Sequence, residues 1–141
     1  MHDYKKLKIW EKSVELAIEL YRITSTFPKD EIYGMTSQIR RAGVSIPSNI
    51  AEGCGRNYPK DSIQFFYIAR GSIYELETQL YLSFDLEYIE AVKLNQLLIL
   101  TETTRKLLSG FIKYYAIILG VEFFNNISNL MILFYLCFKY F

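Results

Sequence analysis

Histidine and cysteine are scarce in this chain, and neither is arranged for catalysis or metal binding. The 141 residues contain one histidine, His2, and two cysteines, Cys54 and Cys137, which are far apart in the sequence. A structural zinc site needs several closely spaced ligands, and a nucleophilic triad needs a positioned base. We therefore expect no metal, no cofactor, no small-molecule substrate and no enzymatic activity, and two reduced thiols without a disulfide.

An excess of one charge is also missing. Sixteen Lys and Arg residues stand against fifteen Asp and Glu residues, which gives a formal net charge of +1 at pH 7. This balance argues against a strongly basic nucleic-acid binder but leaves room for a local basic patch. The first residues, MHDYKKLKIWEK, are charged where a secretory signal is apolar, so we expect a cytoplasmic protein.

The apolar stretches near the C-terminus are too short to span a membrane. Residues 114–121 and 130–138 both fall below the roughly 20 residues that a spanning helix needs. The residues that separate them include Glu122, Asn125, Asn126, Ser128 and Asn129. We expect residues 117–141 to form an apolar extension that packs on the rest of the chain or on another subunit, with membrane association as the second alternative.

Helical periodicity dominates the remainder of the chain. Apolar spacing predicts helices over residues 4–24, 31–52 and 59–86, and a fourth from about residue 91. Because the connections are short, we expect residues 1–116 to form an all-α, antiparallel up-down four-helix bundle. The predicted core-facing stripes are Leu7, Trp10, Val14, Ala17 and Tyr21; Ile39, Ala42, Ile46 and Ile50; Phe66, Ala69, Ile73, Leu76, Leu80 and Phe84; and Leu94, Leu97, Leu98, Thr101, Leu108, Phe111 and Ile112.

Capping residues mark the ends of the second helix. Asp30 is the predicted N-cap, and Glu31 is placed favourably beside the helix dipole. Gly53 and Gly55 are expected to stop the helix. Pro59 fits the first turn of the third helix, where no backbone N–H is needed.

The centre of the second helix, QIRRAGVSIPSNIAEG at residues 38–53, combines one proline with a polar face. Pro47 lacks an N–H and crowds the carbonyl of Gly43, so we expect a kinked helix. Polar residues follow each other at intervals of three and four along one face. These residues are Ser45, Ser48, Asn49 and Glu52, and we expect the polar stripe to be structural, because buried polar groups need partners.

Basic residues suggest where a nucleic acid would bind. One group is close to the N-terminus, and a second surrounds the central helix. The candidates are Lys5, Lys6, Lys8 and Lys12 in the first group, and Arg40, Arg41, Arg56 and Lys60 in the second. Two alternatives stay open: the lysines form an ordinary solvated face, or the arginines pair with Glu52, Glu75 or Glu77 in a purely structural scaffold.

Apolar residues also exceed what four core-facing stripes hide. Twelve tyrosines and ten phenylalanines are many for one small domain. The residues expected outside the stripes are Ile9, Ile18, Leu20 and Ile23 in the first helix, and Phe65, Tyr67, Tyr74 and Tyr81 in the third. We therefore expect a homo-oligomer, with Gly71 and Ser72 allowing another helix to approach closely.

Three motifs together resemble a known family. They are LKIWEKSVELAIELY at residues 7–21, FPKDEIYGMTSQIRRAGVSIPSNIAEGCGR at residues 27–56 and IARGSIYELETQL at residues 68–80. They resemble the four-helix bundle proteins encoded in intervening sequences of bacterial 23S rRNA genes, over about residues 4–115. Glu87 departs from the pattern, because the family usually has glycine there, and the tail beyond about residue 116 has no counterpart.

The resemblance implies an antiparallel four-helix bundle that assembles into a homopentamer without catalytic residues. A relative, the accessory protein of diversity-generating retroelements, binds nucleic acid and a reverse transcriptase through a basic surface. By that likeness the expected partner is RNA or a nucleoprotein.

Overall fold

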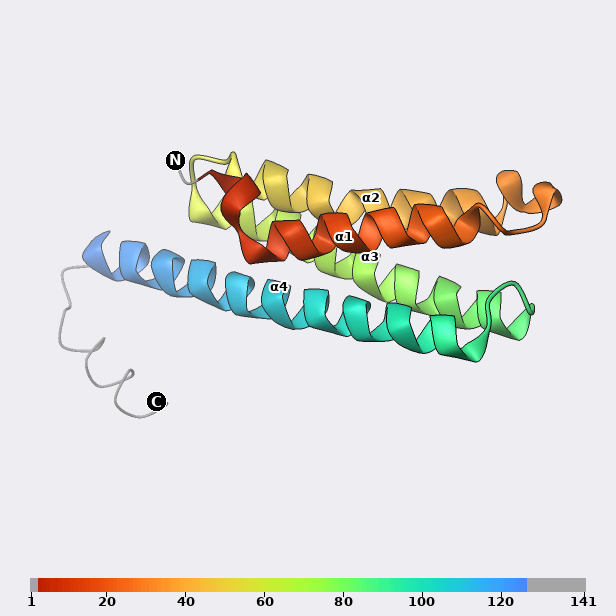
Figure 1. Cartoon of the computed structure of the whole chain (residues 1–141). Helices are drawn as coiled ribbons and strands as arrows, with labels where there is room; N and C mark the ends of the chain where they lie inside the picture. The colour runs from red at the N-terminus through yellow and green to blue at the C-terminus, as the bar shows by residue number, and fades with distance from the viewer. Residues whose placement is uncertain (1–2, 127–141) are drawn as a thin grey trace.

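The computed structural model describes residues 3–126, with side chains as far as Gly120. Within this range the chain forms four long helices and two short 3-10 helices, and no strand. The elements are η1 (Tyr4–Lys6), α1 (Lys8–Thr24), η2 (Lys29–Ile32), α2 (Met35–Cys54), α3 (Pro59–Asp85) and α4 (Ala91–Asn126). Successive helices run in opposite directions (Figure 1), so the predicted all-α, antiparallel up-down bundle is confirmed.

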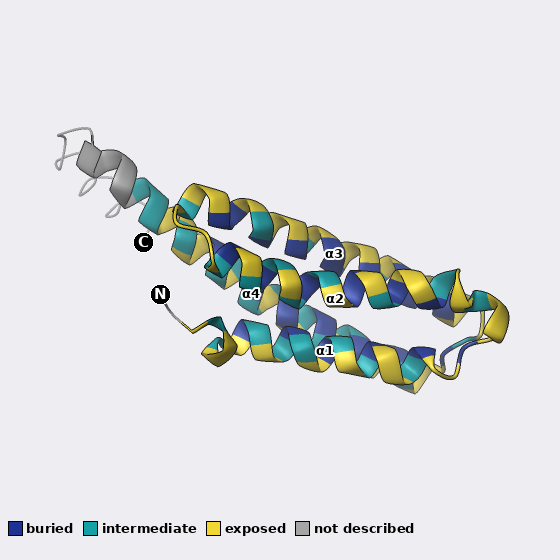
Figure 2. Cartoon of the chain, turned by 90° about the horizontal axis from the view of Figure 1, so that it is seen from above, coloured by how far each residue is buried: buried dark blue, intermediate teal, exposed yellow. Residues whose placement is uncertain are grey.

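Each long helix packs against two others around a shared core. α1 and α3 both contact α2 and α4, and the buried faces point toward the interior (Figure 2). Phe66, Ile46 and Leu108 are among the side chains with no exposed surface. Burial of a side chain of this size stabilises the fold by about 1.5–3 kcal/mol, so this core is the main source of stability.

The core-facing stripe of α1 is displaced by one position from the prediction. Leu16 and Leu20 are completely buried, whereas Tyr21 is 47% exposed. The buried residues of α1 are Ile9, Ser13, Leu16, Leu20 and Thr24. Leu7 and Trp10 of the predicted stripe pack against the core from its edge, but the placement of Val14, Ala17 and Tyr21 in the core was wrong, as was that of Ile9 and Leu20 outside it.

Two buried hydroxyls explain the displaced stripe. Ser13 Oγ donates to the carbonyl of Trp10 at 2.7 Å, and Thr24 Oγ1 donates to the carbonyl of Leu20 at 2.7 Å. A hydroxyl that bonds to its own helix can be buried without an unmet hydrogen bond. Hydrophobic periodicity counts both residues as polar, so it favours the wholly apolar stripe beside them.

The stripes of the other helices agree better with the sequence. All four predicted residues of α2 are buried, and so are Phe66, Ala69, Ile73, Leu76 and Leu80 of α3. Phe84 is 38% exposed, so its inclusion was wrong. In α4 five predicted residues are buried, and Leu98 and Phe111 pack against the core from its edge.

The start of α2 differs from the prediction in its capping residue. The helix begins at Met35, after η2, and not at residue 31. Its N-cap is Gly34, and Glu31 Oε2 accepts from the backbone N–H of Met35 at 2.7 Å. A β-carbon on Gly34 would lie 2.3 Å from the same carboxylate oxygen. Glu31 therefore does the capping predicted for Asp30, and Gly34 leaves space for it.

Glycines at the end of α2 serve two different purposes. Gly53 was expected to stop the helix, but it is buried inside it, because the helix continues to Cys54. A β-carbon on Gly53 would lie 2.3 Å from Cε1 of Phe66, so glycine is needed for α2 and α3 to approach. Gly55 is the C-cap, as predicted, and its N–H bonds to the carbonyls of Ala51 and Glu52.

Pro47 lies inside α2, and the helix is bent, as predicted. The missing N–H leaves the carbonyl of Gly43 without its usual helical donor. Gly43 itself is buried, and a β-carbon there would lie 2.6 Å from Cδ1 of Leu20. The bend and this small residue together bring α2 close to α1.

The turn between α3 and α4 is closed by a residue in an unusual conformation. Glu87 has φ of 60°, the left-handed region that favours glycine. Its N–H bonds to the carbonyl of Phe84 at 2.9 Å, and the N–H of Tyr88 bonds to the carbonyl of Ser83 at 2.8 Å. This pair of bonds is a Schellman motif. The position where this chain departs from its resembled family is therefore one where the backbone favours glycine.

α4 continues without interruption through residue 116 and ends at Asn126. Among the side chains described, as far as Gly120, Tyr115 is the last that packs against the core cluster. Beyond it the helix includes the first ten residues of the predicted extension, 117–126. The remainder of the extension, including Cys137, lies outside the described residues, as does His2.

Candidate nucleic-acid interface

Most of the predicted basic residues gather at one end of the bundle. η1 packs against α2, and Figure 1 shows the start of the chain beside the α2–α3 connection. The residues brought together there are Lys5, Lys6, Lys8, Arg56 and Lys60, with Lys12 one turn further along α1. The first group and two residues of the second, Arg56 and Lys60, thus belong to one surface, which we call the basic end.

Four of these lysines extend into solvent. Lys5, Lys6, Lys8 and Lys60 are all exposed. The side chain of Asp3 begins η1 by accepting from the N–H of Lys5 at 3.2 Å. Exposed ammonium groups of this kind suit phosphate oxygens, which Lys binds as a point charge.

Lys12 and Arg56 are partly committed to intramolecular partners. Lys12 Nζ lies 2.5 Å from Glu15 Oε2. Arg56 forms an ion pair with Glu52, and its guanidinium lies 4.4 Å from the centroid of the Phe65 ring. The pairing of Arg56 with Glu52 is one of those expected of a structural scaffold. Because Lys12 and Arg56 already have acidic partners, they offer less charge to a ligand than the exposed lysines do.

Lys113 is a member of the basic end that the sequence analysis missed. It is exposed on α4, next to Tyr114. Tyr114 lines the same cavity as Leu7 and Arg56. Nothing in the sequence connects Lys113 to the N-terminal lysines, because only the packing of α4 beside α1 brings them to the same end.

Several acidic residues gather at the other end of the bundle. η2 and the α3–α4 turn meet there, because Tyr88 donates to Glu31. The acidic residues of this end are Asp30, Glu31, Asp85, Glu87 and Glu90. The two ends of the bundle thus differ in their exposed charges, although Asp3, Glu15 and Asp61 lie near the basic lysines and Lys29 lies in η2.

Arg40 and Arg41 lie apart from the basic end, on the side of α2. Arg40 Nε donates to Thr24 Oγ1 at 2.8 Å, and its guanidinium lies 4.7 Å from the centroid of the Tyr21 ring. Arg41 lies 3.6 Å from a carboxylate oxygen of Glu75 on α3. These contacts stabilise the α1–α2 and α2–α3 pairs, so the structure does not unite all eight predicted residues.

An open cleft of about 680 Å³ runs along this side of α2. Both arginines line it, together with Tyr21 and Val44 and several polar residues. The polar lining residues are Thr36, Ser37, Ser45, Ser48 and Asn49. Three residues of the predicted polar stripe thus share one cleft with Arg40 and Arg41.

The polar stripe divides into a paired half and an exposed half. Asn49 Nδ2 donates to the carbonyl of Ser45 at 2.8 Å and to Ser45 Oγ at 3.0 Å. Ser72 Oγ on α3 donates to Ser45 Oγ at 2.9 Å. Ser48 and Glu52 are exposed. The contact of Ser72 with Ser45 also shows why a small residue is useful there, since it lets α2 and α3 approach.

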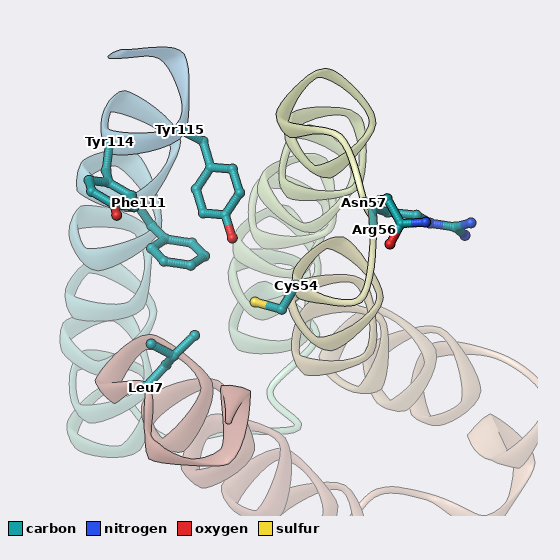
Figure 3. A pocket seen from close by; sticks show the side chains of 7 residues that line it. All are labelled: Leu7, Cys54, Arg56, Asn57, Phe111, Tyr114 and Tyr115. Atoms are coloured by element: carbon teal, nitrogen blue, oxygen red, sulfur yellow. The ribbon is translucent and has the colours of Figure 1, made fainter. Parts of the chain in front are cut away.

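A cavity of about 340 Å³ lies at the basic end (Figure 3). Cys54, Tyr115 and Phe111 face it, while Arg56 points away from it. Burial raises the pKa of the Cys54 thiol and of the Tyr115 hydroxyl, so both groups are neutral near pH 7. A protonated thiol is a poor nucleophile, so Cys54 is not activated for covalent chemistry.

No group of three or more His, Cys, Asp or Glu side chains among the described residues is placed to hold a metal ion. None of their helices is both long and apolar enough to cross a membrane.

The fold places the chain among up-down four-helix bundles with a bent second helix. Residues 5–110 match the model of the 23S rRNA-intervening sequence protein family. This chain belongs to that family.

A solved structure supports the same assignment. It is described as a protein with unknown function from the S23 ribosomal protein family of Bacteroides thetaiotaomicron. The two are 28% identical with a TM-score of 0.70, and the match covers 74% of this chain and 98% of the other. No curated protein matches this chain.

Proposed function

We propose that this chain is a non-enzymatic, self-associating bundle protein of the cytoplasm that binds RNA, alone or within a nucleoprotein, through its basic end. The observation that carries the proposal is the packing of η1, with Lys5 and Lys6, against α2 beside the α2–α3 connection, where Lys60 begins α3. Phosphate contacts from clustered cations supply most of the affinity of non-specific nucleic-acid binding. A closed ring of five copies is the assembly that the family resemblance implies.

Self-association increases the expected affinity for RNA, because each copy adds one basic end to the assembly. If copies lie side by side and parallel, their basic ends share one face of the assembly. Several weak sites on one face bind a long RNA much more tightly than a single site, because each later contact is intramolecular. A chain of balanced charge is thus able to bind a polyanion.

A second candidate is a structural scaffold without a nucleic-acid role. It is favoured by the ion pairs Arg56–Glu52 and Arg41–Glu75, which use two of the proposed arginines inside the chain. Exposed pairs of this kind contribute only about 0–1 kcal/mol each. They leave the lysines of the basic end unused, and for this reason RNA binding is the stronger candidate.

A salt titration tests the proposal. The full chain is titrated with a fluorescent single-stranded 20-nucleotide RNA by anisotropy between about 50 and 200 mM salt. We expect the association constant to fall steeply with salt. The double variant Lys5→Gln/Lys60→Gln is expected to bind more weakly and to reduce the logarithmic salt slope by roughly 1.4, or about 0.7 for each lost contact.

The matched control is Lys29→Gln/Lys106→Gln, which removes the same charge away from the basic end. It is expected to retain the slope of the unmodified chain. An unmodified chain that shows no shift at the lowest salt would favour the scaffold. Equal weakening by both double variants would show that binding does not depend on the basic end.

A further inference from the structure

An apolar groove lies between α1 and α2 on the side of the bundle. Its volume is about 540 Å³. The residues that line it are Val14, Ala17, Ile18, Tyr21, Arg22, Val44 and Pro47. Ile18, Tyr21 and Val44 keep 43–47% of their surface exposed. Contiguous exposed apolar surface of this kind is typical of an interaction site.

A ridge of aromatic side chains follows the outer face of α3. It consists of Tyr67, Gly71, Tyr74, Thr78 and Tyr81, which recur at intervals of three and four residues. The three tyrosines are 42–50% exposed. The guanidinium of Arg70 lies 4.7 Å from the Tyr67 ring and that of Arg105 lies 5.9 Å from the Tyr74 ring. Rings held in this way lose less entropy when a partner covers them.

Gly71 leaves a notch in the ridge, and no contact among the described residues requires glycine at this position. It was expected to admit another helix, yet no atom lies within 4 Å of where its β-carbon would be. Glycine inside an exposed helix costs about 1 kcal/mol relative to alanine. Gly43 and Gly53, in contrast, have close neighbours within the chain.

We propose that the groove of one copy receives the ridge of a second copy, in a heterologous contact. This inference rests on the self-association in the proposed function and names its two surfaces. The groove is formed by α1 and α2 and the ridge by α3, so they cannot meet within one chain. Groove against groove leaves both hollows unfilled, and ridge against ridge leaves both grooves open.

The spacing along the two surfaces matches. Tyr74 and Tyr81 are seven residues apart, about 10.5 Å along a helix, and so are Val14 and Tyr21 in the groove. In an up-down bundle α1 and α3 run in the same direction, so parallel copies align these two pairs. The ridge continues to Asp85, and the groove contains Arg22 close to the same end of the bundle. In the parallel alignment Asp85 lies near the Arg22–Glu19 ion pair of the next copy, and all basic ends share one face.

Two variants test the groove and the ridge separately. Val44→Glu places a charge in the groove, and Tyr74→Glu places one on the ridge; both positions are exposed, so the fold is expected to survive. Gly71→Trp is a second ridge variant that fills the notch. Ile99→Glu, at a 60% exposed position on α4, is the matched control. Sedimentation velocity of each full chain at micromolar concentration measures assembly, and circular dichroism checks the helix content.

We expect the unmodified chain and Ile99→Glu to sediment as the same oligomer, and each groove or ridge variant as a 16.6 kDa monomer. An equimolar mixture of Val44→Glu and Tyr74→Glu is expected to form a dimer and nothing larger, because one intact groove and one intact ridge remain. A Val44→Glu or Tyr74→Glu variant that dimerises alone overturns the heterologous contact. Variants that keep the full oligomer overturn the choice of surfaces, whereas a monomeric unmodified chain overturns the proposed self-association itself.

Discussion

The hydroxyl of Tyr88 donates to Glu31 Oε1 at 3.0 Å across 57 residues of sequence, while the other oxygen of that carboxylate accepts from the N–H of Met35. One side chain therefore caps α2 and holds the α3–α4 turn. The ring of Phe27 lies 5.4 Å from that of Tyr88 and covers the same end of the core. This end of the bundle is closed by contacts between its two connections, α1–α2 and α3–α4.

The Tyr88 hydroxyl is expected to stabilise the fold below about pH 10 and to lose this effect at higher pH. The hydrogen bond to Glu31, with a smaller contribution from burial, raises the pKa of Tyr88 above its usual value. A raised pKa in the folded state gives stability that is complete below the unfolded pKa of about 10 and is lost as pH rises through the folded pKa.

Urea unfolding at pH 8 and at several pH values above 10 tests this expectation. Tyr88→Phe is expected to be less stable than the unmodified chain at pH 8, with the difference shrinking as pH rises. Tyr33→Phe, at a position that is 91% exposed, serves as the control and is expected to show no such trend. A difference that stays constant across this range contradicts the role assigned to the Tyr88–Glu31 bond.

Glu87→Gly is expected to stabilise the bundle. The backbone at Glu87 has φ of 60°, where a β-carbon is strained and glycine is not. The expected gain is about 0.5–1 kcal/mol in the free energy of unfolding, measured by urea denaturation. Glu87→Ala keeps the β-carbon and removes the charge, so it should give no comparable gain. Equal gains from both variants would point to charge and not to backbone strain.

Gly53→Ala is expected to destabilise the bundle by about 1–3 kcal/mol. The added methyl group would lie 2.3 Å from the fully buried ring of Phe66, so α2 and α3 must separate or the ring must move. Gly110→Ala is the matched control, because no atom lies within 4 Å of its β-carbon position. That control is expected to stabilise the helix by about 0.5–1 kcal/mol, and thermal unfolding of both variants decides the matter.

Asn49→Leu is expected to lower the melting temperature before it affects any ligand. The change removes two hydrogen bonds to Ser45, at a cost of about 1 kcal/mol in stability. Ser48→Ala, at an exposed position of the same stripe, is expected to leave the melting temperature unchanged. If Asn49→Leu instead kept its melting temperature and oligomeric mass but lost RNA binding, the stripe would be a binding site.

The amino-acid pattern was sufficient for the architecture because helix formation is mainly a local matter. Apolar spacing, Pro59 in the first turn of α3 and Pro47 within α2 identified four helices and a bend without any knowledge of contacts. The stripes of α2 and α3 followed from the same spacing, since each helix has an uninterrupted apolar row, although α3 buries Ser62, Ser72, Gln79 and Ser83 beside that row. The family likewise followed from three contiguous motifs.

Tertiary structure alone decided the details that depend on distant partners. Ser13 and Thr24 are core residues of α1 because helical carbonyls accept their hydroxyls, which periodicity does not register. Glu31 displaced Asp30 as the capping residue because its carboxylate also reaches Tyr88. The basic end likewise exists only once η1 packs against α2 and brings the first lysines beside the α2–α3 connection. Local propensity therefore determined the elements, and packing determined which of their surfaces are buried, paired or left open for a partner.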